Sequence, residues 1–199
     1  MKKTVAIAAI PLLVVVFLIS CNQEPAKIAG AGTDATISAD SLVKRGAYLV
    51  GVMGCNDCHS PKIMGPMGPE PDPNLLLSGY PAAMPVAKID TTTMHNWVLF
   101  NIMNTAVAGP WGVSFSANLT SDSTGIGNWT EEQFSTALRH GKSKGLEANR
   151  MLLPPMPWPN YVHLKDEDLK AIFAYLKSTK PIKNNVPEPI PPTQINKKG

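Results

Sequence analysis

The chain has 199 residues, of which 44% are hydrophobic and 17% are charged. This composition fits one globular domain and excludes collagen, a coiled coil and a wholly disordered protein. The formal charge of +3 falls to about +1 if the segment that holds Lys2 and Lys3 is removed, which excludes a strongly basic nucleic-acid-binding protein. Three cysteines are an odd number for an exported protein that relies on disulfides, so each cysteine needs its own assignment.

Residues 1–20 have a short basic start followed by an apolar run, which predicts a secretory signal peptide rather than a membrane span. Residues 18–21, Leu-Ile-Ser-Cys, resemble the lipobox of bacterial lipoproteins, in which the cysteine is lipidated and becomes the new N-terminus. We expect lipid on Cys21, with the protein exported, anchored to a bacterial membrane and facing the periplasm. An uncleaved anchor and an ordinary signal with an incidental cysteine are the alternatives. Residues 21–37 are small and polar, as in a flexible tether.

The first helix is predicted over about residues 39–53, with Ser38 or Asp40 as its N-cap. Leu42, Leu49 and Met53 form one apolar face at helical spacing. Glycine inside a helix costs up to about 1 kcal/mol relative to alanine, so the glycines of this segment predict a close packing contact.

Residues 55–59 read Cys-Asn-Asp-Cys-His, the C-x-x-C-H pattern of a c-type haem attachment site. On one helical turn the thiols of Cys55 and Cys58 can each add to one haem vinyl group, and His59 then lies beneath the iron as its proximal ligand. A structural zinc site would need two further thiol or imidazole ligands, and the sequence has no second C-x-x-C. A thioredoxin-like pair would belong to an α/β pattern, which the sequence lacks. We therefore expect one covalent haem c.

The middle of the chain separates His59 from the next haem-ligand candidates by a long insertion. Residues 60–85 hold seven prolines and predict an irregular loop around the haem edge. Residues 97–100 are apolar, and residues 113–120 alternate between apolar and polar side chains, which is typical of a half-buried strand. We expect a small β-ribbon in this insertion.

The next helix signal lies at residues 130–141. Thr130 and Gln133 match a capping box, Trp129 and Phe134 match a hydrophobic staple, and Gly141 suits the C-terminal end.

The sixth ligand of the iron decides between electron transfer and chemistry on a bound molecule. Met156 is the one thioether in a segment with four prolines at residues 154–159, which fix an extended loop. We expect Met156 to be the distal ligand, and a buried methionine in a surface loop is the alternative. Met151 lacks flanking prolines, His140 suits a surface role at a helix C-terminus, His163 is a reserve ligand, and His95 reads as a structural or surface residue.

The last helix is predicted from about residue 166 to residue 178, since its apolar side chains follow an i, i+3, i+4, i+7 stripe: Leu169, Ile172, Phe173 and Leu176. Asp166, Glu167 and Asp168 favour the helix N-terminus, although Lys165 is a poor N-cap. Pro181 closes the helix. Residues 181–199 are rich in proline and lysine and predict a disordered, mobile tail.

Two segments resemble known cytochromes. Residues 45–49 are similar to the N-terminal helix of class I cytochromes c, in which a glycine lets the C-terminal helix cross closely; this implies that Phe173 or Tyr175 meets Gly46. That family also places its distal methionine between two helices, as Met156 is placed here. Residues 117–129, with Phe134 and Arg139, resemble the cytochrome c subunits of bacterial membrane-bound dehydrogenases, although those commonly carry several haems and this chain has one C-x-x-C-H.

The resemblance implies a mainly α cytochrome c fold over residues 38–180, in which three or more helices surround one haem and carry a Pro/Gly-rich loop and a small β-ribbon. Trp111, Arg139 and Trp158 are candidates to line the haem or meet its propionates, and ordinary packing is the alternative for each. The expected function is one-electron transfer between redox protein partners at the membrane, with no substrate at the iron. The alternatives are an electron-entry subunit of an exported dehydrogenase or oxidase, and a binder of gas or peroxide with a displaceable Met156.

Overall fold

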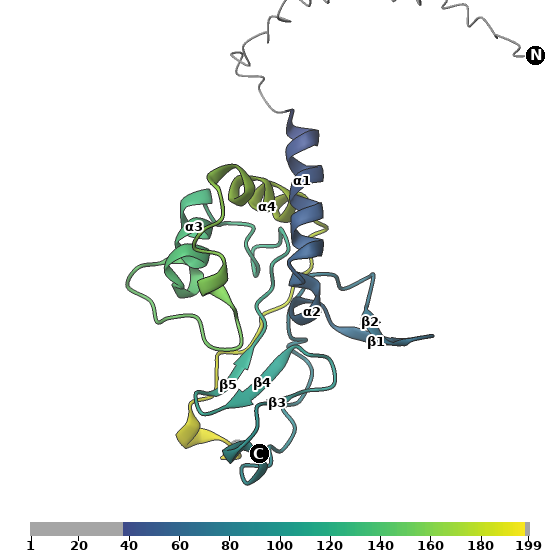
Figure 1. Cartoon of the computed structure of the whole chain (residues 1–199). Coiled ribbons are helices and arrows are strands. Elements are labelled where there is room, and N and C mark those ends of the chain that lie inside the picture. Colours follow the sequence, from purple (N-terminus) through teal and green to yellow (C-terminus); the bar gives the residue numbers. More distant parts are fainter. Residues whose placement is uncertain (1–37, 198–199) are drawn as a thin grey trace, which may run out of the picture. The chain divides into compact units, whose positions relative to one another are not determined.

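The computed structural model describes residues 38–197, and Figure 1 shows their arrangement. The predicted signal peptide, Cys21 and the predicted tether lie outside these residues. The described residues form four α-helices: α1 (Ala39–Val52), α2 (Cys55–His59), α3 (Glu131–His140) and α4 (Asp166–Ser178). Four short 3-10 helices accompany them: η1 (Thr93–His95), η2 (Ser143–Gly145), η3 (Trp158–Asn160) and η4 (Pro192–Gln194). Between residues 38 and 197, every helix is too short or too polar to cross a bilayer.

Helix α1 begins and ends where its sequence predicts. The Ser38 hydroxyl accepts a hydrogen bond from the backbone N–H of Ser41, so Ser38, rather than Asp40, is the N-cap. The helix ends two residues before Gly54, whose φ of +68° is a left-handed conformation that favours glycine.

Helices α1 and α4 cross at a glycine (Figure 1). A Cβ atom added at Gly46 would overlap the carbonyl oxygen of Ala171 and would lie 2.7 Å from the Cβ atom of Tyr175. Of the two aromatic residues expected at this crossing, Tyr175 is therefore the one that meets Gly46. The glycine lets the two backbones approach more closely than any side chain would allow.

Helix α3 is closed at both ends by the predicted residues. Thr130 accepts from the backbone N–H of Gln133 and the side chain of Gln133 accepts from the backbone N–H of Thr130, which completes the capping box. Gly141 ends the helix with a φ of +65°. Helix α4 has no side-chain cap at Lys165, and three acidic residues occupy its first turn, where they interact favourably with the helix dipole.

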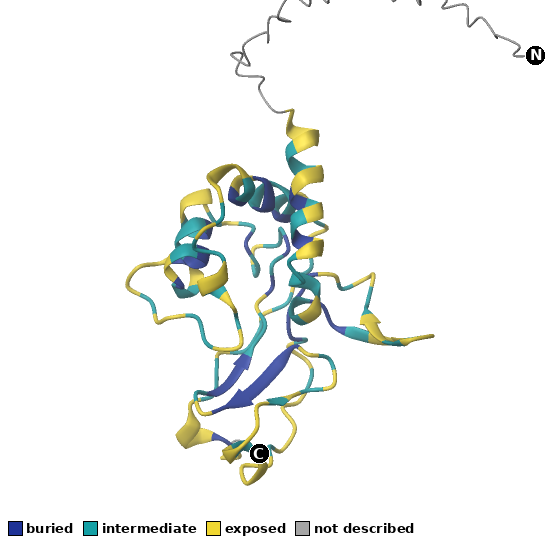
Figure 2. Ribbon diagram, in the orientation of Figure 1, coloured by how far each residue is buried: buried dark blue, intermediate teal, exposed yellow. Residues whose placement is uncertain are grey.

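The main core lies among α1, α3 and α4. Its buried members are Val50, Leu77, Ile126, Phe134, Leu138, Leu169, Ile172 and Leu176. Figure 2 shows these inward faces as buried, whereas most of α1 away from α4 is exposed.

A β-hairpin occupies part of the segment that we expected to be an irregular loop. Strands β1 (Lys62–Gly65) and β2 (Gly68–Pro71) pair antiparallel, with Ile63 opposite Glu70 and Gly65 opposite Gly68. The loop prediction rested on the many prolines of residues 60–85. Proline cannot donate a backbone hydrogen bond to a neighbouring strand, so it is excluded from central strands but not from edge strands. In a two-stranded hairpin both strands are edges, so the prolines of β2 are tolerated.

The predicted β-ribbon is present as a three-stranded antiparallel sheet. Strand β4 (Ala106–Gly109) lies between β3 (Leu99–Phe100) and β5 (Gly112–Phe115). Strand β5 is shorter than the alternating segment over residues 113–120. Beyond Phe115 the backbone forms hydrogen bonds with loop residues, including Leu77 and Tyr80, rather than with a neighbouring strand. Its apolar face joins a second core cluster with buried Ala108, Val113 and Ile195.

The predicted mobile tail is wrong, because residues 180–197 pack against the domain. Ile190 pairs with Val113 at the free edge of β5, and Ile195 is buried in the second cluster. The side chain of Asn184 donates to the carbonyl oxygens of Ser78 and Tyr80 at 2.7 and 2.8 Å. Proline keeps this segment extended, and two separated isoleucines anchor it, so it carries no apolar periodicity that a sequence pattern would reveal.

The crossing at Gly46 gives a test with an internal control. Gly46→Ala should lower the free energy of unfolding by about 2 kcal/mol or more, because the added methyl group overlaps backbone atoms of α4 that cannot move independently. Gly51→Ala, on the same helix but with no atom within 4 Å of the added Cβ, should be neutral or stabilising by up to about 1 kcal/mol. Guanidinium unfolding of both haem-loaded variants measures the difference, and equal stabilities would contradict the close crossing.

Candidate haem site

The C-x-x-C-H segment is the short helix α2, which begins directly after Gly54. The backbone N–H of Asp57 donates to the carbonyl of Gly54, the N-cap residue, at 2.9 Å, and this hydrogen bond spans the first turn of α2. Positions i and i+3 of a helix lie on the same side, so Cys55 and Cys58 share one face of this turn. The local fold thus supplies the thiol spacing that the sequence predicts.

Both thiols are free and partly buried. Burial raises the pKa of the Cys55 thiol to about 11, and burial followed by the Asp57 charge raises the pKa of Cys58. Cys55 also packs against the main core. The surroundings therefore disfavour the thiolate form of both side chains.

His59 is held by one of its two ring nitrogens. Its Nδ1 lies 2.8 Å from the carbonyl oxygen of Ala117, which can only accept, so Nδ1 carries the proton in that bond. Burial lowers the pKa of His59, although the bond to Ala117 opposes this effect. A neutral imidazole protonated on Nδ1 presents the lone pair of Nε2, which is the state that a metal ligand requires.

Lys62 joins α2 to the hairpin that follows it. Its ammonium group donates to the carbonyl oxygens of Asn56, Asp57 and Ser60 at 3.0, 3.0 and 2.5 Å. The Asn56 and Asp57 carbonyls belong to α2, and the third carbonyl belongs to Ser60, the residue directly after it. Burial lowers the pKa of Lys62, and the nearby Asp57 carboxylate opposes this effect. Sequence reasoning missed this residue, because a lysine two positions after a helix has no distinctive pattern.

The Met156 loop is fixed by three contacts from different parts of the chain. The Ser114 hydroxyl donates to the Pro154 carbonyl at 2.7 Å, and the Leu152 N–H donates to the carbonyl that ends α3 at 2.6 Å. Met151 pairs with Lys142 as an isolated β-bridge. Met156 itself is partly buried and packs against the same core as Cys55. The predicted distal sulfur and the first thiol therefore border one cluster.

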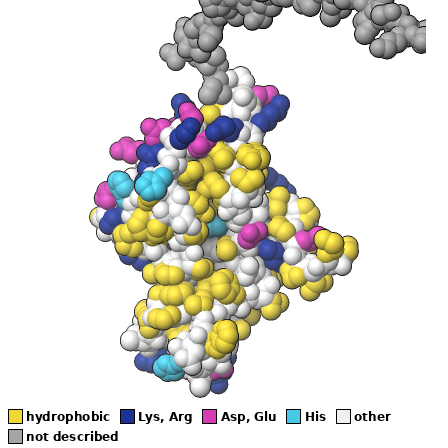
Figure 3. All heavy atoms as spheres, in the orientation of Figure 1, with side chains coloured by type: hydrophobic (Ala, Val, Ile, Leu, Met, Phe, Trp, Pro, Cys, Tyr) yellow, Lys and Arg dark blue, Asp and Glu magenta, His cyan; other side chains and the backbone are white. Residues whose placement is uncertain are grey.

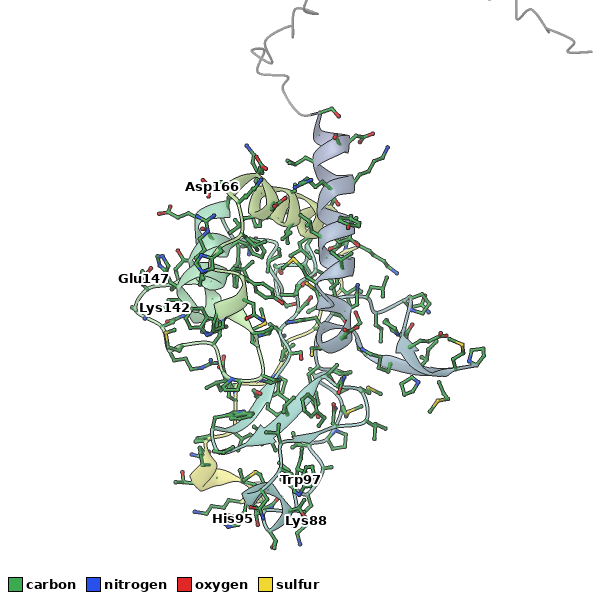
Figure 4. All side chains as sticks on the ribbon, viewed as in Figure 1. Lys88, His95, Trp97, Lys142, Glu147 and Asp166 are labelled. Carbon is green, nitrogen blue, oxygen red and sulfur yellow. The ribbon has the colours of Figure 1, made fainter. Side chains whose placement is uncertain are left out.

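The rival ligands have other environments. His140 is exposed and its Nδ1 lies 2.8 Å from a carboxylate oxygen of Glu147, while His95 and His163 are also exposed. Figure 4 shows His95 at the end of the domain that holds β3, away from the loop that carries Glu147. Met151 is 42% exposed. Met156 is thus the better buried thioether in this loop.

Tyr161, which sequence reasoning did not single out, lies near the two thiols. Burial raises the pKa of its phenol, and a thiolate at Cys55 or Cys58 would raise it further. Like Met156, it packs on the main core. No spacing or motif distinguishes this tyrosine from an ordinary core residue, so only the fold reveals its position.

The three side chains suggested for contact with the cofactor have different surroundings. Arg139 donates to the Leu164 carbonyl and pairs with Asp166, so it fastens the start of α4 to α3. The ring of Trp158 lies over Gly141 at the end of α3. The Nε of Arg139 is buried without a hydrogen-bond partner among the described residues.

The indole of Trp111 lies over Gly109 on the side of the ribbon that carries Ser114. Its Nε1 is buried without a hydrogen-bond partner among the described residues. A buried N–H of this kind suits a carboxylate, such as a haem propionate.

The sequence matches the description "Cytochrome c" over residues 43–180. This chain belongs to the cytochrome c family. Membership implies a covalently bound haem c, and the residues present fit that group. They comprise two thiols on one helical turn, an imidazole whose Nδ1 is already engaged, and a thioether that packs on the same core as Cys55.

Several relatives of this cytochrome are subunits of larger enzymes. The gluconate 2-dehydrogenase cytochrome c subunit of Pantoea cypripedii is 34% identical over 137 residues, which cover 68% of this chain and 23% of the relative. The fructose dehydrogenase cytochrome subunit of Gluconobacter japonicus is 44% identical over 93 residues, or 45% of this chain and 18% of the relative. The cytochrome c subunit of alcohol dehydrogenase (quinone) of Gluconobacter oxydans is 28% identical over 153 residues, or 75% and 24%. The match thus spans about a quarter or less of each relative.

Proposed function

We propose that this protein is a one-electron carrier with a single haem c, attached through Cys55 and Cys58 and ligated by His59 and Met156. When bound, the haem supplies an iron that alternates between Fe(II) and Fe(III). The observation that carries the proposal is the fixed imidazole: Ala117 holds Nδ1–H of His59, so Nε2 is free to ligate. The thiols beside it have the spacing that haem attachment requires.

One segment supports both proposed axial ligands. The carbonyl oxygen of Ala117 orients His59, and three residues earlier the Ser114 hydroxyl holds the backbone of the Met156 loop. Because both contacts come from β5 and its continuation, we expect the relative positions of the two ligands to stay the same when the charge on the iron changes. A carrier that exchanges electrons rapidly needs such pre-organised ligands.

A sulfur on the sixth position would leave no vacancy for a substrate at the iron, and this separates electron transfer from gas or peroxide binding. Axial ligands shift haem potentials over about 0.8 V, and a Met/His pair favours the reduced iron. Electrons would then enter and leave through the exposed edge of the cofactor rather than through a molecule bound to the iron.

Met156→Ala tests the sixth ligand. The variant should have a lower reduction potential, lose the weak far-red band of sulfur-to-iron charge transfer, and bind CO in the ferrous form, which the parent protein should resist. Met151→Ala, in the same loop but more exposed, should change none of these properties. Redox titration and optical spectra provide the measurements. An unchanged potential in Met156→Ala would assign the position to another residue, and tight CO binding by the parent protein would favour a gas binder.

We further propose that Cys21 carries lipid and holds the protein at a bacterial membrane, facing the periplasm. The support is the sequence Leu-Ile-Ser-Cys behind an apolar run. Each buried CH₂ of an acyl chain contributes about 0.8 kcal/mol to membrane binding, so several chains on one residue give a stable anchor.

Cys21→Ala should move the haem-stained protein from the membrane fraction to the soluble fraction, if residues 1–20 are still cleaved. Detergent phase separation and the mass of the N-terminal peptide measure anchoring and acylation. Ser20→Ala, which keeps the cysteine, is the matched control. A parent protein whose N-terminal peptide carries no acyl mass, or still includes residues 1–20, would contradict lipidation at Cys21.

The relatives favour a second, more specific role, as the electron-accepting subunit of an exported dehydrogenase whose substrate chemistry takes place on another chain. All three relatives described above are named as cytochrome subunits of dehydrogenases. A mild detergent extract of membranes should therefore yield this haem protein in a stoichiometric complex with a larger chain. Substrate added to that complex should reduce the haem, and a haem protein that purifies alone and fully active as a carrier would contradict this role.

A further inference from the structure

The β1–β2 hairpin places an apolar tip in solvent directly after the haem-attachment helix. We define the hairpin tip as Ile63, Met64 and Met67, which are 43%, 79% and 100% exposed. Figure 2 shows the hairpin as a projection with many exposed residues, and Figure 3 shows mainly hydrophobic side chains over it. Contiguous exposed apolar side chains are uncommon on free proteins and mark interaction sites.

The hairpin is a firm extension of α2. Lys62, the first residue of β1, donates to three carbonyl oxygens of residues 56–60. The backbone N–H of Asp72 donates to the Pro61 carbonyl at 2.8 Å and closes the base of the hairpin. A partner seated on the tip would therefore lie at a fixed position relative to Cys58 and His59.

The charges around the tip have one predominant sign. Residues 55–76 contain three acids, Asp57, Glu70 and Asp72, and one base, Lys62, whose ammonium group is turned to backbone carbonyls. The carboxylate of Glu70 lies over Gly65, across the hairpin, and Asp57 is exposed on α2. The Asp57 carboxylate is close enough to the Lys62 ammonium to raise the pKa of that lysine, so the unbalanced negative charge comes from Glu70 and Asp72, which form the acidic border of the apolar tip.

We propose that the hairpin tip docks a redox partner protein whose contact face is an apolar hollow edged by lysine and arginine. This inference rests on the proposed electron-transfer function. Methionine side chains are unbranched and polarisable, so they adapt to a partner surface and separate again without a large ordering cost. Opposite charges around such a contact accelerate and orient the encounter.

The acidic border argues against two other occupants. A second copy of this chain would bring two negative borders together, which costs free energy. An anionic lipid surface would repel the same carboxylates. Both occupants are nevertheless measured in the test below.

The experiment compares two oxidants of the ferrous, haem-loaded full chain in neutral detergent. Tris(1,10-phenanthroline)cobalt(III) is a cation with an apolar aromatic surface, and ferricyanide is an anion; each takes one electron from Fe(II) haem. Met64→Gln/Met67→Gln should slow the cobalt reaction about fivefold, equivalent to about 1 kcal/mol of contact free energy. The rate with ferricyanide should stay within about twofold, since anions avoid the acidic border.

A second variant and a matched control separate charge from apolar contact. Glu70→Gln should also slow the cobalt reaction and should weaken its dependence on ionic strength. Val98→Gln/Ile102→Gln replaces side chains that are 43% and 88% exposed next to β3, at the end of the domain where Figure 4 labels Trp97, and should change neither rate.

Three outcomes would overturn the proposal. If the hairpin and control variants changed the rate of the cobalt reaction equally, the tip would not be a docking site. A dimer in sedimentation that Met64→Gln/Met67→Gln disperses would assign the tip to a second copy. Flotation of the Cys21→Ala protein with vesicles of phosphatidylcholine and phosphatidylglycerol, lost in the same hairpin variant, would assign it to lipid. Failure of ferricyanide to oxidise the parent protein would instead refute the electron-transfer function itself.

Discussion

The structure depends above all on the hydrogen bonds of the segment 112–120. Its backbone orients His59 through the carbonyl of Ala117, and the Ser114 hydroxyl holds the Met156 loop. The same segment binds the backbone of Leu77 and Tyr80 on one side and Ile190 of the tail on the other. Parts of the chain that are far apart in sequence thus meet at β5 and the residues that follow it. These contacts determine the geometry of the proposed site.

The alternation of side chains along this segment explains how it serves two cores. Val113 and Phe115 face the second cluster, with Ala108 and Ile195, whereas Ser114 faces the Met156 loop. Leu119, beyond the strand, packs on the main core. A shift of one residue in register would exchange these faces, so the Ser114 contact and the burial of Val113 would be lost together.

The elements with local signals could be read from the sequence, and those held by distant contacts could not. Capping at Ser38 and Thr130 is a property of short stretches, and the structure agrees with both. The close crossing at Gly46 joins distant residues, and it was expected only through the resemblance to class I cytochromes c. The C-x-x-C-H spacing likewise identifies the attachment segment. The partner of His59 is a backbone carbonyl, which every residue possesses, so no sequence pattern could have named Ala117.

The course of the tail has a consequence for the order in which the domain is completed. Ile190 meets Val113 across 77 residues of chain, and Ile195 fills the second cluster from a point still closer to the C-terminus. Contacts of such long sequence separation form late, because loop closure must precede them. The free edge of β5 therefore stays open until residue 190 can reach it, whereas α2 needs only residues up to His59. The attachment segment can thus form before the last strand edge is covered.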